Sequence, residues 1–333
     1  MNYNKTNLIS DSKIQIKNYF PERGIEKIRE EIFEGLKAQE KYISSKYFYD
    51  ELGSALFEKI TKLPEYYPTR TEKQILRTMD WVFIQNLKNL NIYELGSGDH
   101  SKISLVIQHI PEKYRKTLTY SPVDISASAV EQSAKNLRKI FPEIQIQGYV
   151  ADFIHQLDFI DDNSNRLFSL FGSTIGNFTE ELSFDFMQKV NHIMKSGEHF
   201  LVGFDTVKDT QTLEAAYNDK QKVTETFNLN ILNVVNQLCK TNFSTKDFRH
   251  IAFYNKQQNR IEMHLEALKN ITVTSRYLPE SIKIKQGERI HTENSYKFDN
   301  EKIKRIAEQS GFQIKRIFND SNNWFNLALL QKE

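Results

Sequence analysis

Between Ile92 and Asp205 the chain alternates short apolar runs with helix-length amphipathic segments. This alternation is typical of a parallel β-sheet with helices on its faces, because parallel strands need long crossover connections. Between the strands we expect helices, for example at 126–140, with Ser126 as N-cap, and at 180–194. The chain is therefore predicted to have an α/β fold. The apolar runs predict five strands, at residues 91–95, 118–123, 144–150, 166–171 and 199–204.

The C-terminal part of the chain completes this sheet. Residues 298–310 predict a helix that ends before Gly311, and two β-rich runs follow at 312–318 and 324–330. Turn-forming residues at 319–323 join the two runs. We therefore expect an antiparallel hairpin that closes a sheet of seven strands.

Two other regions, 20–90 and 208–290, do not follow the α/β rhythm. The first predicts helices with a tyrosine-rich, proline-punctuated bend, and the second mixes helices with a β-like piece around 260–271. We therefore predict a second, mixed α+β lobe beside the sheet domain. The expected boundaries are 71–207 and 298–333 for the sheet domain, and 20–70 and 208–297 for the lobe.

Charge and composition exclude several classes of protein. The 45 Lys and Arg residues nearly balance the 43 Asp and Glu residues, so we expect no nucleic-acid partner. No run reaches the roughly 18 apolar residues of a membrane helix, and residues 1–17 are polar, which predicts a cytoplasmic protein without a membrane partner. The single cysteine, Cys239, forbids an internal disulfide, and no His-x-x-x-His pair supports a metal site.

Glycine is scarce, so the positions that keep it are informative. There are 12 glycines, whereas average usage of roughly 7% would give about 23. Gly96 and Gly98 come directly after the first predicted strand, in a turn that lets a ligand approach the backbone and the following helix N-terminus. Ser101 stands where the dinucleotide-binding fingerprint has its third glycine, which argues against a nicotinamide dehydrogenase.

Acidic residues follow the next two predicted strands. Asp124 stands at the end of the second strand, where a nucleoside's ribose hydroxyls are commonly held. Asp152, followed by Phe153, stands at the end of the third, where an acid can accept a hydrogen bond from an adenine amino group. Together with the glycine turn they predict an adenosine-type cofactor. The alternative is that both aspartates are helix caps.

The fourth strand ends in a segment that contains Gly172, Gly176 and Asn177. Because ligands of open α/β sheets bind beyond the carboxyl ends of the strands, Asn177 is placed to hydrogen-bond a polar substrate group. The competing role is a plain N-cap for the helix predicted at 180, for which Thr179 is also suitable.

These motifs occur together with several longer blocks in a fixed order. With them, the chain resembles the S-adenosylmethionine-dependent histidine Nα-methyltransferase family, from about Lys46 to Leu330. The resemblance implies a class I methyltransferase (Rossmann-like) fold and S-adenosyl-L-methionine as cofactor. It also implies transfer of three methyl groups to the α-amine of L-histidine, which gives hercynine, the first intermediate of ergothioneine biosynthesis. The blocks are residues 46–54, 63–72, 203–209, 213–219, 260–265 and 290–298.

The resemblance also implies roles for individual residues. Gly96 and Lys102 would contact the methionine part of the cofactor, Asp124 its ribose, and Asp152 with the Phe153 backbone its adenine. The remaining residues would act on the substrate: Asn177 and Tyr217 on its α-carboxylate and amine, Tyr49 near the reacting amine, Glu293 and Ser295 on the imidazole, and Tyr66 and Met263 as walls of the pocket.

Other interpretations remain open at this point. Met263 as core filler, Tyr66 as a turn residue and Glu293 as a solvated charge are the plain structural alternatives. The same fold also serves methylation of another aromatic amino acid or amine, such as tryptophan or tyramine, or a non-catalytic sensor of cofactor or amino acid. The expected partner is a small amino acid, and we expect a monomer.

Overall fold

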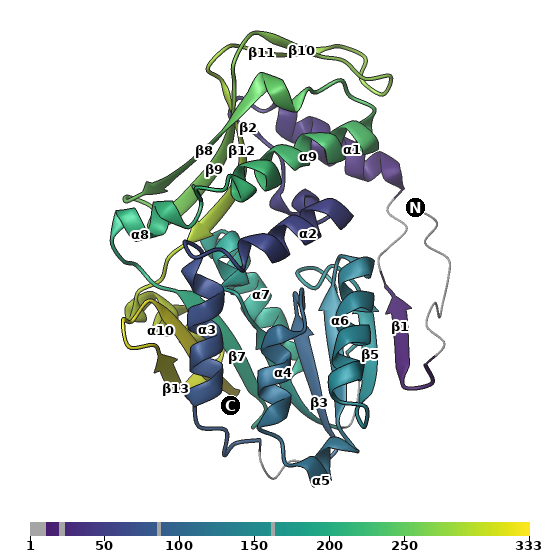
Figure 1. The fold of residues 1–333 in the computed structure, drawn as a ribbon, viewed down its shortest axis with the longest axis vertical. Helices are drawn as coiled ribbons and strands as arrows, with labels where there is room; N and C mark the ends of the chain where they lie inside the picture. The colour runs from purple at the N-terminus through teal and green to yellow at the C-terminus, as the bar shows by residue number, and fades with distance from the viewer. Residues whose placement is uncertain (1–10, 20–23, 85–87, 161–163) are drawn as a thin grey trace. The chain divides into compact units, whose positions relative to one another are not determined.

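The computed structural model describes residues 11–19, 24–84, 88–160 and 164–333. The chain divides into two compact units, each assembled from separate stretches of sequence (Figure 1). Unit 1 comprises Met1–Phe20, Pro68–Val207 and Lys297–Glu333, and unit 2 comprises Pro21–Tyr67 and Lys208–Tyr296. We describe each unit by itself.

Unit 1 contains one sheet of eight strands, in the order β1-β5-β4-β3-β6-β7-β14-β13. Neighbouring strands from β1 to β7 pair in parallel, and β14 pairs antiparallel with both β7 and β13. All seven predicted strands and the C-terminal hairpin are confirmed, and with them the class I methyltransferase fold. The seven are β3 (Leu90–Leu95), β4 (Thr119–Asp124), β5 (Gln145–Val150), β6 (Asn165–Leu170), β7 (His199–Asp205), β13 (Phe312–Asn319) and β14 (Phe325–Lys332).

The eighth strand corrects the expected number of seven. Strand β1 (Ile14–Asn18) pairs in parallel with β5 at the edge of the sheet, with Ile14 opposite Ile146. Only Ile14 of its five residues is buried. A short edge strand that is mostly exposed has almost no apolar signal, and its partner lies far away in the sequence.

Helices pack against this sheet and enclose its core. The N-cap prediction for α6 is confirmed, because the Ser126 hydroxyl accepts a hydrogen bond from the Ala129 N–H. Helix α6 packs on β4 and β5, and α10 packs on β13 and α7. The buried core includes Leu76, Ile92, Ile103 and Leu137. The helices are α3 (Tyr67–Thr78), α4 (Ser101–Gln108), α5 (Glu112–Arg115), α6 (Ala127–Ile140), α7 (Glu180–Ile193) and α10 (Asn300–Gln309).

Unit 2 combines helices with a four-stranded sheet in the order β2-β12-β9-β8. The sequence predicted one β-like piece here, but the structure contains the sheet and a separate pair of short strands, β10 and β11. Cys239 is buried at the end of α9. The strands are β2 (Lys41–Tyr42), β8 (Phe248–Asn255), β9 (Arg260–Ala267), β10 (Ile271–Val273), β11 (Ile282–Ile284) and β12 (Arg289–Tyr296). The helices are α1 (Ile25–Lys37), α2 (Glu51–Ile60), α8 (Thr210–Ala215) and α9 (Val223–Cys239), with 3-10 turns η1 (Ser45–Phe48) and η3 (Thr245–Asp247).

A β-bulge interrupts the pairing of β12 with β9. His291 stands opposite His264, and Glu293 stands opposite Met263, so Thr292 is the extra residue on β12. Because side chains alternate between the two faces of a strand, a single extra residue changes the face of everything that follows.

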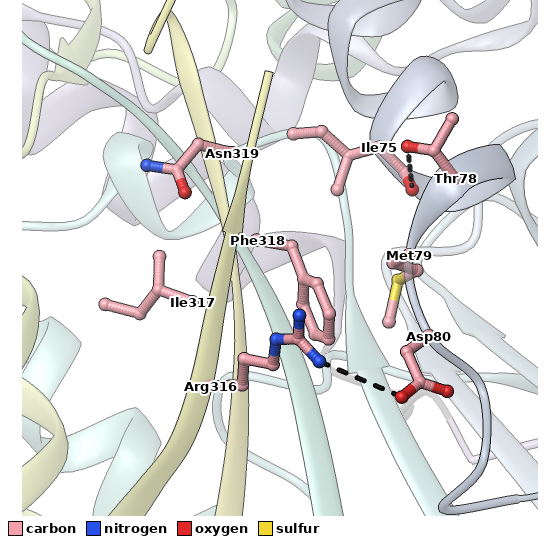
Figure 2. A pocket seen from close by; sticks show the side chains of 8 residues that line it. All are labelled: Ile75, Thr78, Met79, Asp80, Arg316, Ile317, Phe318 and Asn319. Carbon is pink, nitrogen blue, oxygen red and sulfur yellow. Dashed lines mark hydrogen bonds and ion pairs between the residues drawn. The ribbon is translucent and has the colours of Figure 1, made fainter. Parts of the chain in front are cut away.

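A pocket of about 360 Å³ lies in unit 1, where the end of α3 faces β13 (Figure 2). The Arg316 guanidinium lies 3.8 Å from the Asp80 carboxylate at its mouth, and both side chains are more than half exposed. None of the predicted site residues lines this pocket. Among the described residues, no helix is both long and apolar enough to cross a membrane.

Candidate active site

The glycine turn after β3 has the backbone shape that the sequence predicted. Gly96 has φ +67° and Gly98 has φ +49°, values that L side chains rarely adopt. A β-carbon on Gly98 would meet nothing within 4 Å, whereas one on Gly96 would lie 3.4 Å from the Phe153 ring. The buried Ser97 hydroxyl has no hydrogen-bond partner among the described residues. The open space and the unsatisfied hydroxyl fit a polar cofactor at this turn.

Asp124 is tied to this turn. Its carboxylate accepts hydrogen bonds from the backbone N–H of Gly98 at 3.1 Å and of Ser126 at 2.9 Å. Burial raises the pKa of the Asp124 carboxyl above its usual value. The helix-cap alternative is wrong for Asp124, because Ser126 caps α6.

Asp152 lies in a local turn after β5. It accepts a hydrogen bond from the Ile154 N–H at 3.2 Å and lies 2.9 Å from His155 Nδ1. No helix begins at this position, so the helix-cap alternative is wrong here too. The Phe153 ring packs edge-on against Phe186, with ring centroids 5.9 Å apart.

The sequence reasoning missed Glu72, a carboxylate on α3 that is fully buried. One of its oxygens lies 2.7 Å from Lys102 Nζ, and the Gly172 N–H donates to both oxygens at 3.0 and 2.8 Å. A β-carbon on Gly203 would overlap the same carboxylate. Glu72 therefore helps to explain why residue 203 is a glycine, whereas Gly172 is explained by its φ of +76°. A single carboxylate on a helix has no spacing signal that would have revealed it.

Asn177 lies half-buried in the 3-10 turn η2 (Thr174–Asn177) after β6. The N-cap alternative is wrong, because the Thr179 hydroxyl accepts from the Leu182 N–H at 3.2 Å and caps α7. Asn177 therefore remains available for the predicted substrate role.

The structure brings the predicted substrate residues of unit 2 together. Glu293 stands opposite Met263, and Ser295 stands opposite Ile261, which places all four side chains on one face of the sheet. The Tyr217 hydroxyl donates a 2.7 Å hydrogen bond to the Ser295 hydroxyl. Glu293 is only 9% exposed, so the solvated-charge alternative is wrong.

Aromatic contacts continue this cluster. The Tyr66 ring lies 6.4 Å from the Tyr217 ring, and the Phe57 ring lies 6.2 Å from Tyr66 and 5.8 Å from Tyr49, measured between centroids. Phe57 was not predicted as a site residue, yet it connects two tyrosines that were. Phe227 on α9 also contacts Tyr49, at 6.0 Å. The result is an aromatic wall of the kind that attracts cations.

A separate polar cluster lies on the opposite face of the same sheet. His264 lies 3.1 Å from Glu262 and its ring contacts His291 at 5.1 Å. Burial lowers the pKa of both histidines. No group of three His, Cys, Asp or Glu side chains within the described ranges is arranged to hold a metal ion.

The fold and the strand-end residues of unit 1 define a class I methyltransferase. The model of the histidine-specific, S-adenosylmethionine-dependent methyltransferase family matches residues 28–332, and the chain belongs to this family. A histidine N-alpha-methyltransferase of Mycobacterium tuberculosis is 33% identical over 92% of this chain and 95% of the relative. A histidine N-alpha-methyltransferase of Mycolicibacterium smegmatis is 34% identical over 95% of this chain and 98% of the relative. A solved methyltransferase from Clostridium acetobutylicum aligns at 10% identity with TM-score 0.43, covering 78% of this chain and 95% of that one.

Proposed function

We propose that this enzyme transfers three methyl groups from S-adenosyl-L-methionine to the α-amine of L-histidine and so produces hercynine, the first step of ergothioneine biosynthesis. The family match over residues 28–332 carries the proposal. The buried arrangement of Glu293, Ser295 and Tyr217 supports it, because these groups suit an imidazole ring.

Unit 1 is assigned to the cofactor, which supplies an electrophilic methyl group on a sulfonium. Gly96, Gly98 and Lys102 hold its amino-acid part, with Lys102 acting as a cation toward the carboxylate. Asp124 holds the ribose hydroxyls, and Asp152 with the Phe153 backbone holds the adenine.

Unit 2 is assigned to the imidazole. The Tyr217 hydroxyl donates a hydrogen bond to the Ser295 hydroxyl, and in this proposal the Ser295 hydroxyl donates in turn to the unprotonated ring nitrogen of the substrate. The Glu293 carboxylate accepts from the other ring nitrogen, which carries the proton. Met263 and Tyr66 form the walls of this pocket. An indole, with one nitrogen, satisfies only half of these groups, which favours histidine over tryptophan.

The amine is the nucleophile and must react as the neutral form. Asn177 and Tyr217 orient the α-carboxylate and amine, and Tyr49 contacts the amine. Before each transfer the α-ammonium loses a proton to water or to the Tyr49 hydroxyl, and desolvation beside aromatic rings favours the neutral amine that results. After the last transfer the product is a quaternary ammonium, which the rings of Tyr49, Phe57 and Phe227 stabilise by cation–π attraction.

A panel assay tests this proposal and its alternative. The protein is incubated with methyl-labelled cofactor and with histidine, tryptophan or tyramine in turn. We expect label only in histidine. Turnover of tryptophan or tyramine without histidine would favour the other amine methyltransferases, and cofactor binding without any turnover would indicate a sensor. The proposal includes action as a monomer in the cytoplasm.

A further inference from the structure

A buried chain of hydrogen bonds in unit 2 begins at the bulge of β12. The Thr292 hydroxyl lies 2.8 Å from Asn228 Oδ1 and 3.1 Å from the Met263 carbonyl. Asn228, on α9, is fully buried, and its amide nitrogen lies 3.1 Å from the His264 carbonyl and 2.8 Å from His250 Nδ1. His250 Nε2 in turn lies 2.9 Å from the Tyr217 carbonyl.

The partners fix the orientation of the Asn228 amide and the position of the proton on the His250 ring. The His264 carbonyl can only accept, so the Asn228 atom beside it is the amide NH₂, and His250 Nδ1 must accept the second N–H. The Tyr217 carbonyl can also only accept, so His250 Nε2 carries the ring proton. Both ends of the chain therefore require the same neutral form of His250. The Thr292 hydroxyl is the donor to two acceptors, Asn228 Oδ1 and the Met263 carbonyl, which share its one proton.

The bulge held by this chain determines which way Glu293 points. Because Thr292 is the extra residue of the bulge, Glu293 and Ser295 lie on the same face of the sheet as Met263 and Ile261. Without the bulge, Thr292 would take the place opposite Met263, and Glu293 would move opposite Glu262 on the other face. Two carboxylates would then face each other, and the imidazole-binding face would lose its acid.

We propose that Thr292, Asn228 and His250 are positioning residues for recognition of the substrate's imidazole. They hold the bulge that presents Glu293 and Ser295, and they link it to the main chain of Tyr217, whose hydroxyl contacts Ser295. This inference rests on the proposed function. It explains why a polar network lies between α9 and the sheet, where apolar packing would satisfy the fold alone.

The test compares Thr292→Val with Thr292→Ser. Valine keeps the shape and loses the hydroxyl, whereas serine keeps the donor. We expect Thr292→Val to raise the histidine KM about tenfold or more, with kcat within about twofold of wild type, because a buried acceptor loses its donor. We expect Thr292→Ser to restore a KM within about threefold of wild type, and calorimetry to give the wild-type cofactor Kd for both variants. An unchanged KM in Thr292→Val, or equal effects of the two substitutions, would overturn the inference.

A second pair of variants, at His250, tests the inference even if Thr292→Val does not fold. His250→Asn keeps an acceptor for the Asn228 amide, whereas His250→Leu does not, so we expect the leucine variant to have the higher histidine KM. Equal KM values for this pair would also overturn the inference.

Nitrogen-15 NMR of the His250 ring gives a readout that needs no turnover. We expect the neutral form protonated at Nε2, and a ring protonated at Nδ1 would contradict the network. If the wild-type protein does not methylate histidine, the proposed function is wrong, and so is the role assigned to Thr292, Asn228 and His250. The NMR result still decides whether the hydrogen-bond network itself exists.

Discussion

In unit 1 the predicted cofactor residues Gly96, Asp124 and Asp152 stand at the ends of parallel strands, whereas in unit 2 the predicted substrate residues Met263, Glu293 and Ser295 lie on one face of the antiparallel pair of strands β9 and β12. The first group depends on backbone shape: Gly96 and Gly98 adopt positive φ, and Asp124 accepts from the Gly98 N–H. The second group depends on register, which the bulge at Thr292 sets. A strand end can be found in a sequence, but a register cannot. Sequence spacing therefore predicts the cofactor residues at the strand ends, whereas only the pairing of β12 with β9 determines which substrate residues share a face.

The largest effect is expected at the buried ion pair of unit 1. Lys102→Met leaves the fully buried Glu72 carboxylate without its cation, which should lower the free energy of unfolding by about 3–5 kcal/mol. Lys135→Met is the matched control, because Lys135 pairs with Glu131 at 3.5 Å on the surface. That change should cost about 0–1 kcal/mol. Urea unfolding measures both, and equal losses would contradict a structural role for Glu72.

A pH-dependent effect is expected at Glu94, also in unit 1. Burial raises the pKa of its carboxyl from 4.5 to about 8, while the Tyr120 hydroxyl donates to it at 2.6 Å. The folded state therefore keeps a proton that the unfolded chain loses, so stability falls as the pH rises from 4.5 toward 8. Glu94→Gln keeps an acceptor for Tyr120 and removes this titration.

Unfolding curves at pH 5 and pH 8 measure the difference between Glu94→Gln and wild type. The glutamine variant should gain stability over wild type at the higher pH, by about 2–4 kcal/mol. A constant difference between the two proteins at both pH values would show that Glu94 is ionised in the folded state.

In unit 2 the expected effect is on substrate affinity. Glu293→Ala removes the acceptor for the imidazole N–H, so the histidine KM should rise about 10- to 100-fold. The cofactor Kd should stay unchanged, because the cofactor residues belong to the other unit. Glu280→Ala, at an exposed position of unit 2, is the control. An unchanged KM in Glu293→Ala would remove this residue from the pocket.

The smallest effect is expected at the glycine turn. Gly98→Ala and Gly197→Ala both place a β-carbon at positive φ with nothing within 4 Å, so each should cost about 1 kcal/mol of stability. Only Gly98 lies in the predicted cofactor turn. By calorimetry, we expect a higher cofactor Kd for Gly98→Ala and a wild-type cofactor Kd for Gly197→Ala. Equal values would place the cofactor elsewhere.

The same differences explain which strands and site residues could be predicted from the sequence. The central strands β3, β4, β6 and β7 follow from apolar runs that are buried on both faces. The predicted strand ends located Gly96, Asp124 and Asp152. Strand β1 was missed because only Ile14 is buried and its partner strand is distant. Glu293 was named only through the family resemblance. The bulge that orients it depends on pairing between β12 and β9, which no local pattern shows.

Mass spectrometry of histidine incubated with the protein and S-adenosyl-L-methionine tests the central claim most directly. The account predicts histidine carrying one, two and finally three added methyl groups, all on the α-amine. Histidine recovered without any added methyl group, under conditions where the cofactor binds, would contradict it.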